Sequence, residues 1–147
     1  MFALHPQLQR DCLLITDLPL SRVLLMNDCQ YPWTILVPRR KNISEIIDMN
    51  QADQQQLWRE SAWMSCALQQ HCKPDKLNVA ALGNKVPQLH IHHIARFKDD
   101  PAWPQPVWGK LPATAYSPTR GETEIAALRK LLEQQQCERE HDHQYNP

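Results

Sequence analysis

Three of the seven histidines of the chain lie within four residues, in the stretch Gln88-Leu89-His90-Ile91-His92-His93-Ile94. In a strand, successive side chains point to opposite faces, so His90 and His92 share one face. Gln88 lies on that face too, and His93 lies on the other. An imidazole carries two polar nitrogens that need partners, and histidine has no marked preference for strands. A chemical role therefore explains two histidines on one face of a strand better than packing does.

Length and charge limit the classes of function. A chain of 147 residues suits one domain with a hydrophobic core. With 16 basic and 16 acidic residues, the formal charge is zero, and no bulk field favours nucleic acid or a membrane surface. No apolar run approaches the roughly 20 residues of a membrane span, and residues 1–10 lack the pattern of a secretion signal. We therefore expect a cytoplasmic protein with no nucleic-acid or membrane partner.

The first 97 residues alternate between short apolar runs and turn residues, with one long segment free of glycine and proline. The apolar runs predict strands, and the first three suggest an antiparallel meander. The long segment has apolar residues at helical spacing after Asn50, a favourable N-cap, and should cover one side of the sheet. We thus predict an α+β fold, with five strands at 12–16, 22–26, 33–37, 76–82 and 86–97 and a main helix at about 51–71.

The composition changes after Lys98, where five prolines and two tryptophans fall within residues 99–120. Tryptophans between prolines usually pack on something, either the body of the domain or a second subunit. A last helix is expected from about 121 to 136, followed by a polar tail that includes His141 and His143. We assign residues 1–98 to the catalytic core and 99–147 to an extension within the same domain.

Three interpretations of the histidine strand compete. The first is a polar patch whose histidines are satisfied by neighbours. The second is a metal site, since two histidines at i and i+2 can share an ion, although a catalytic zinc needs a third ligand. The third is nucleophilic catalysis on a phosphate, in which a neutral imidazole attacks phosphorus and water later cleaves the phosphoramidate.

The third interpretation has requirements that the sequence can meet. The attacking ring needs one nitrogen free and the other fixed by a hydrogen bond. A second histidine can hold the phosphate oxygens, and a tight turn can offer N–H groups to them. The turn Gly83-Asn84-Lys85 lies directly before the strand and could supply these groups, with Lys85 adding a positive charge.

The stretch 88–94 resembles the signature of the histidine triad (HIT) family, His-φ-His-φ-His-φ-φ, in which φ is an apolar residue. The resemblance covers roughly residues 12 to 97. Gly83-Asn84-Lys85 stands where members often have Gly-Gln-Ser/Thr. Trp103-Pro104 is similar to the Trp-Pro that follows the triad in nucleoside-phosphoramidate hydrolases of this superfamily, although the spacing differs.

This resemblance implies a HIT-like fold, a five-stranded antiparallel sheet with a main helix packed on it, usually in a homodimer. It also implies a nucleotide hydrolase or nucleotidyl transferase that attacks the α-phosphate of a nucleotide conjugate. By position, His90 matches the nucleophile and His92 the histidine that contacts the phosphate and the leaving group. Asn84 matches a side chain that touches the phosphate, and Asn27 lies near the place of a ribose-binding acid or amide. We expect no metal and no cofactor.

Several positions depart from the family pattern. Gln88 replaces the first histidine, although in this family its backbone carbonyl is what orients the nucleophile. His93 replaces an apolar residue, Trp33 stands where many members have a fourth histidine, and Lys85 replaces Ser or Thr. These departures concern the substrate more than the reaction class. The alternative to an enzyme is a HIT-fold module that binds nucleotides with little or no turnover.

Overall fold

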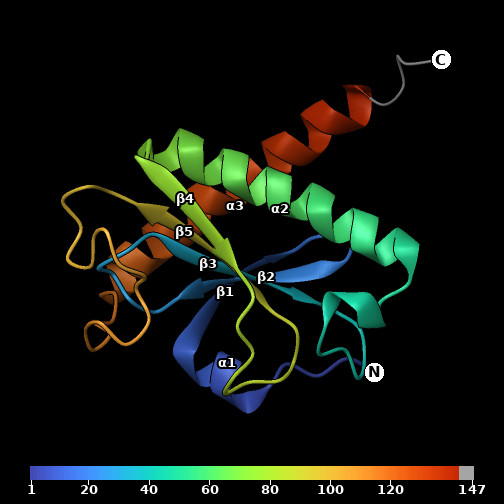
Figure 1. Cartoon of the computed structure of the whole chain (residues 1–147). Helices are drawn as coiled ribbons and strands as arrows, with labels where there is room; N and C mark the ends of the chain where they lie inside the picture. Colours follow the sequence, from blue (N-terminus) through green and yellow to red (C-terminus); the bar gives the residue numbers. More distant parts are fainter. Residues whose placement is uncertain (143–147) are drawn as a thin grey trace.

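The computed structural model describes the backbone of residues 1–142 and the side chains of residues 1–138. Two long helices and a five-stranded sheet form most of the molecule, with a short helix near the N-terminus (Figure 1). The elements, in chain order, are α1 (Pro6–Asp11), β1 (Cys12–Asp17), β2 (Ser21–Met26), β3 (Trp33–Pro38), the 3-10 helix η1 (Ile46–Asp48), α2 (Gln51–Cys72), β4 (Lys76–Ala80), β5 (Ile91–Arg96) and α3 (Pro118–Asp142).

The sheet is antiparallel throughout, with the strand order β1-β2-β3-β5-β4. The first three strands form the predicted meander, and β4 and β5 form a second antiparallel pair after α2. It is β5, not β4, that lies beside β3, with Trp33 opposite Ile94 and Ile35 opposite His92. The last strand is therefore interior to the sheet, and β4 is an outer strand. The predicted α+β class with a five-stranded antiparallel sheet is confirmed.

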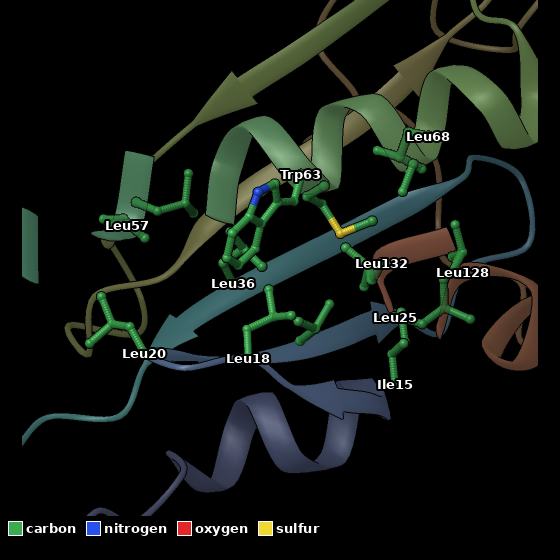
Figure 2. Close-up of a cluster of buried hydrophobic side chains, with 14 of the residues drawn as sticks. Ile15, Leu18, Leu20, Leu25, Leu36, Leu57, Trp63, Leu68, Leu128 and Leu132 are labelled. Atoms are coloured by element: carbon green, nitrogen blue, oxygen red, sulfur yellow. The ribbon is translucent and has the colours of Figure 1, made fainter. Parts of the chain in front are cut away.

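Each face of the sheet has its own apolar cluster, because neighbouring residues of a strand point to opposite faces. Leu36 of β3 belongs to the cluster under α2 and α3, whereas Trp33 and Ile35 belong to the other cluster. Figure 2 shows Trp63 of α2 above Leu36 of β3, and Leu68 of α2 near Leu128 and Leu132 of α3. The helical face thus holds the main core, and the opposite face holds His90 and His92, the two histidines predicted to share a face.

Residues 98–117 pack back on the domain. Asp100 accepts hydrogen bonds from the guanidinium of Arg96 at 2.7 and 3.0 Å, and both side chains are nearly buried. Val107 joins the apolar cluster on the face opposite α2, and Trp108 packs against it. Trp103 lies beside the Arg96 guanidinium, 5.7 Å from ring centroid to Cζ. The proline-rich segment was expected to pack either on the body of the domain or on a second subunit. In the structure it packs on the body of the domain.

Some boundaries differ from the predictions. Strand β5 begins at Ile91, because residues 86–90 run in irregular backbone that holds the N-terminal segment. The last helix begins at Pro118, behind a cap by Ser117, and continues beyond residue 136 to Asp142. Part of the expected polar tail therefore lies in this helix. The side chain of His141 and all of residue 143 lie outside the described residues. Among the described residues, no helix is both long and apolar enough to cross a bilayer.

Candidate active site

His90 stands directly before β5, with its ring held by the backbone two residues earlier. Its Nδ1 lies 2.7 Å from the carbonyl oxygen of Gln88. A carbonyl oxygen can only accept, so Nδ1 carries the proton and Nε2 keeps its lone pair. No hydrogen bond within the described part of the chain involves Nε2. This is the state that a nucleophilic imidazole requires.

His92 lies on the same face as His90, with the two ring centroids 4.9 Å apart. Its Nδ1 is 3.0 Å from the indole Nε1 of Trp33. Burial, followed by the neighbouring histidines 90 and 93, lowers the pKa of His92 to about 3. The His92 ring is therefore neutral at physiological pH, with Nδ1 as acceptor and Nε2 as donor.

Two indoles enclose the His92 ring. The ring centroid of Trp33 lies 5.8 Å from that of His92, and that of Trp108 lies 5.0 Å away at a steep angle. The two indoles also pack edge to face with each other at 5.8 Å. The aromatic contacts fix the orientation of His92, so the proline-rich segment contributes directly to the site through Trp108.

The two histidines open into a cleft of about 610 Å³. The predicted turn forms part of its wall, and all three of its residues, Gly83, Asn84 and Lys85, are exposed. Gly83 has a φ of +71°, a conformation that side-chain-bearing residues rarely adopt. The structure thus brings together five of the predicted site residues at one opening: His90, His92, Gly83, Asn84 and Lys85.

The opposite wall of the cleft comes from the N-terminal segment, which the sequence did not suggest. His5, Gln7, Leu8 and Asp11, in and before α1, line it. Nothing in residues 1–11 marks them as site residues, because their position depends on contacts with residues more than 80 positions away. A weak signal did exist for Trp108, since tryptophans between prolines were expected to pack on something.

The side chain of Gln88 holds this N-terminal segment. Its Oε1 accepts from the backbone N–H of His5 at 2.9 Å, and its Nε2 donates to the carbonyl of Ala3 at 2.9 Å. Gln88 does not itself line the main cleft but a smaller neighbouring one of about 410 Å³. A direct role of the Gln88 side chain in substrate binding therefore stays a prediction, and its observed partners are backbone groups.

Asn27 lies away from the other predicted residues. Its side-chain oxygen accepts from the backbone N–H of Tyr116 at 2.9 Å, and Asn27 is not among the residues that line the cleft. In the structure it fastens the segment before α3 to the end of β2. The neighbouring Met26 does line the cleft. Ribose binding by Asn27 stays a prediction from the family resemblance.

His93 faces the helical side of the sheet, where its Nε2 lies 2.7 Å from Oγ of Ser61 in α2. This is the partner that the sequence could not name. Nδ1 of His93 is buried without a hydrogen bond in the described structure, and burial lowers the pKa of this histidine to about 4. His93 is thus a neutral core residue on the face opposite His90 and His92.

A metal site would need ligands beyond the two cleft histidines. Among the residues whose side chains are described, no three His, Cys, Asp or Glu side chains gather in a way that could hold an ion. The indole N–H of Trp33 occupies Nδ1 of His92, so Nε2 is the nitrogen of that ring that can contact a ligand.

The model of the HIT domain matches residues 7–99, which include the histidine strand and the turn Gly83-Asn84-Lys85. The chain belongs to the HIT family. A comparison with curated proteins gave no match.

Solved structures of HIT proteins superpose closely on this HIT chain. A histidine triad protein from Bradyrhizobium japonicum is 50% identical, with a TM-score of 0.87, and the match covers 89% of this chain and 98% of the other. One from Marinobacter aquaeolei is 48% identical, with a TM-score of 0.89, over 91% and 98% of the two chains. One from Sinorhizobium meliloti is 40% identical, with a TM-score of 0.86, over 88% and 96%. Because each match covers 88 to 91% of this chain, it extends past residue 99.

Proposed function

We propose that this HIT protein is a nucleotide hydrolase or nucleotidyl transferase that acts on the α-phosphate of nucleotide conjugates through a nucleotidyl-His90 intermediate. Dinucleoside polyphosphates and nucleoside phosphoramidates are the two candidate conjugates. The observation that carries the proposal is the Nδ1–H of His90 donated to the Gln88 carbonyl, which leaves Nε2 unprotonated beside the cleft.

In the first step, the lone pair of His90 Nε2 attacks the α-phosphorus, and the bond from phosphorus to the leaving group breaks. The imidazole becomes a phosphorylated cation, whose charge the Gln88 carbonyl stabilises through the retained Nδ1–H. The Nε2–H of His92 donates to a phosphate oxygen. The ring centroids of His90 and His92 are 4.9 Å apart, so both rings can contact the same phosphate. Asn84 and Lys85 approach the same oxygens from the turn.

In the second step, water attacks the phosphorus of the intermediate and the P–N bond breaks. The electron pair returns to Nε2, one proton of the water passes to solvent, and His90 is neutral again. If an acceptor other than water attacks, the same site acts as a transferase. Both steps use the same contacts to the phosphate, so one preorganised set of donors serves each of them.

The cleft also suits the rest of a nucleotide. Its volume of about 610 Å³ is within the range of small-molecule sites. Leu8, Met26 and Leu82 give it an apolar part for a base, whereas Gln7 and Asp11 supply polar groups for a sugar. Lys85 places a cation at the opening. The same features would serve a binding module without turnover, which is the second candidate function.

A His90→Ala variant tests the proposal. It should lose hydrolysis of adenine and guanine nucleotide conjugates by roughly three orders of magnitude or more, because the attacking nitrogen is removed. The matched control is His71→Ala, since His71 pairs with Glu124 on the other side of the molecule. Rapid quenching of the wild type should give a nucleotidyl adduct on His90 by mass spectrometry. Calorimetric binding of AMP with no turnover of any conjugate would instead favour the binding module.

We also propose a homodimer formed along β4. As the outer strand, β4 has backbone groups free to pair with a second strand. Exposed apolar side chains cluster there, with Trp58 of α2 59%, Val79 44% and Leu82 46% exposed. Between α2 and β4, Trp58 and Val79 border a small apolar pocket of about 100 Å³. Because Trp103 and Trp108 pack on their own domain, the support for a dimer comes from this edge.

A further inference from the structure

We propose that Trp33 holds His92 as a neutral hydrogen-bond donor, and that the enzyme is therefore specific for conjugates whose leaving group departs without a proton. The substrate class would be nucleotides joined through a phosphoanhydride or another acidic group, in preference to phosphoramidates. This inference rests on the proposed function and chooses between its two candidate substrates.

The geometry at His92 fixes its tautomer. An indole N–H can donate but never accept, and Nε1 of Trp33 lies 3.0 Å from Nδ1 of His92. Nδ1 must therefore carry a lone pair, and the single proton of the neutral ring is on Nε2. Both side chains are buried, with 7% of Trp33 and 4% of His92 exposed.

The same contact opposes the protonated form of His92. An imidazolium would place an N–H on Nδ1, directly against the N–H of Trp33, and the hydrogen bond would be lost. The indole of Trp108 and the ring of His90 surround the rest of the ring and offer no carboxylate. Of the residues that line the cleft, Asp11 alone is acidic, and its carboxylate accepts from Gln7 instead. The low pKa of His92, caused first by burial, agrees with this arrangement.

A neutral His92 has consequences for bond cleavage. When His90 attacks a phosphoanhydride, the P–O bond breaks and the electron pair stays on a phosphate oxygen, which is stable as an anion. When it attacks a phosphoramidate, the P–N bond breaks and the nitrogen must receive a proton to leave as an amine. The Nε2–H of a neutral imidazole is far too weak an acid to give that proton. His92 can therefore stabilise charge on phosphate oxygens but cannot act as a general acid.

Nuclear magnetic resonance gives a test that does not depend on activity. In protein labelled with ¹⁵N-histidine, the His92 signals should show an unprotonated Nδ1 and a protonated Nε2 from pH 5 to 8. Lys85, Asp11, His5 and His90 are the titratable groups of the cleft, and none of them should change this state. A proton on Nδ1, or titration of His92 between pH 6 and 7, would overturn the inference.

Kinetics test the substrate class directly. We expect kcat/KM for a dinucleoside polyphosphate to exceed that for the phosphoramidate of the same nucleoside by roughly a hundredfold, the usual contribution of a general acid. Trp33→Phe removes the indole N–H and should reduce this ratio at least roughly tenfold, since His92 can then be protonated on Nδ1. Trp63→Phe is the matched control, because it removes a buried indole on the other face of the sheet and should leave the ratio unchanged.

The outcomes separate the two proposals. Faster hydrolysis of the phosphoramidate by the wild type, or a ratio that Trp33→Phe does not change in a folded protein, overturns the inference and leaves the nucleotidyl-His90 mechanism standing. If neither conjugate is hydrolysed, the proposed function fails and the substrate inference fails with it. Thermal melting of both tryptophan variants verifies that each is folded before its ratio is used.

Discussion

The backbone oxygen of Gln88 lies 2.7 Å from Nδ1 of His90, while the side chain of the same glutamine holds the backbone of residues 3 and 5. One residue thus connects the candidate nucleophile to the N-terminal wall of the cleft. A histidine at position 88 could offer the same carbonyl to His90. The glutamine amide, however, supplies both an acceptor and a donor to an extended backbone segment, which makes Gln88 a positioning residue.

Replacing Gln88 should therefore loosen the N-terminal wall without removing the nucleophile. In Gln88→Leu the backbone carbonyl remains, but the N–H of His5 and the carbonyl of Ala3 lose their partners. We expect KM for the preferred conjugate to rise roughly tenfold with a smaller change in kcat, because binding is lost and chemistry is kept. Hydrogen exchange at residues 3–8 should also become faster.

The matched control for this change is Gln54→Leu. Gln54 likewise donates from its side chain to a backbone carbonyl, that of Met49, and it lies outside the cleft. It should leave KM unchanged. If Gln88→Leu lowers kcat as strongly as His90→Ala does, the side chain of Gln88 has a direct part in the reaction.

Stability should fall as the pH is lowered below about 6.5. The buried His92 and His93 have pKa values of about 3 and about 4, both below the ordinary value of 6.5. At a pH between the folded and the unfolded pKa values, these histidines are protonated in the unfolded chain and neutral in the folded chain. Lowering the pH through this range therefore favours unfolding. Each histidine should contribute about 1.2 kcal/mol between pH 6 and 5.

His93→Gln isolates one of these contributions. Glutamine can keep a hydrogen bond with Ser61 but does not titrate. The pH dependence measured by urea unfolding between pH 6.5 and 5 should be smaller in the variant by the contribution of one histidine. Glu60, whose pKa burial raises, acts in the opposite direction in both proteins and cancels in the comparison. An unchanged slope would mean that His93 is not kept neutral.

Glu60 should be important for stability. Its carboxylate is fully buried in α2 and accepts from the backbone N–H groups of Leu20 and Ser21 at 2.7 and 3.0 Å. Glu60→Ala leaves both donors buried without partners, at a cost of about 2 to 4 kcal/mol in the free energy of unfolding. Denaturant unfolding measures this loss. Glu122→Ala, at an exposed position of α3, should cost less than about 0.5 kcal/mol.

If the dimer forms along β4, a charged residue on this strand should leave the protein monomeric. Val79→Lys places an ammonium among the exposed apolar side chains of that edge, next to Trp58. Sedimentation at micromolar concentration should show a dimer for the wild type and a monomer for the variant. Leu14→Lys is the control, since Leu14 is 56% exposed on β1 at the opposite edge of the sheet. A monomeric wild type would contradict the proposal.

Local patterns in the sequence predicted much of the fold. Alternation along residues 88–94 placed His90 and His92 on one face, and their rings are neighbours in the structure. Apolar periodicity after the Asn50 cap located α2, and turn residues separated the first three strands. Such features depend on residues close in sequence, where the preferences of the backbone and the period of the element are sufficient.

The tertiary structure alone decided what surrounds the two histidines. The contact of Trp33 with His92 spans 59 residues, and that of His5 with Gln88 spans 83. Both follow from placing β5 between β3 and β4 and from packing α1 and residue 108 on the same face. No local preference encodes these pairings, because they result from burying both faces of one sheet at once. The sequence by itself thus determined which side chains could do chemistry, and the packing determined their tautomers and the walls of the cleft.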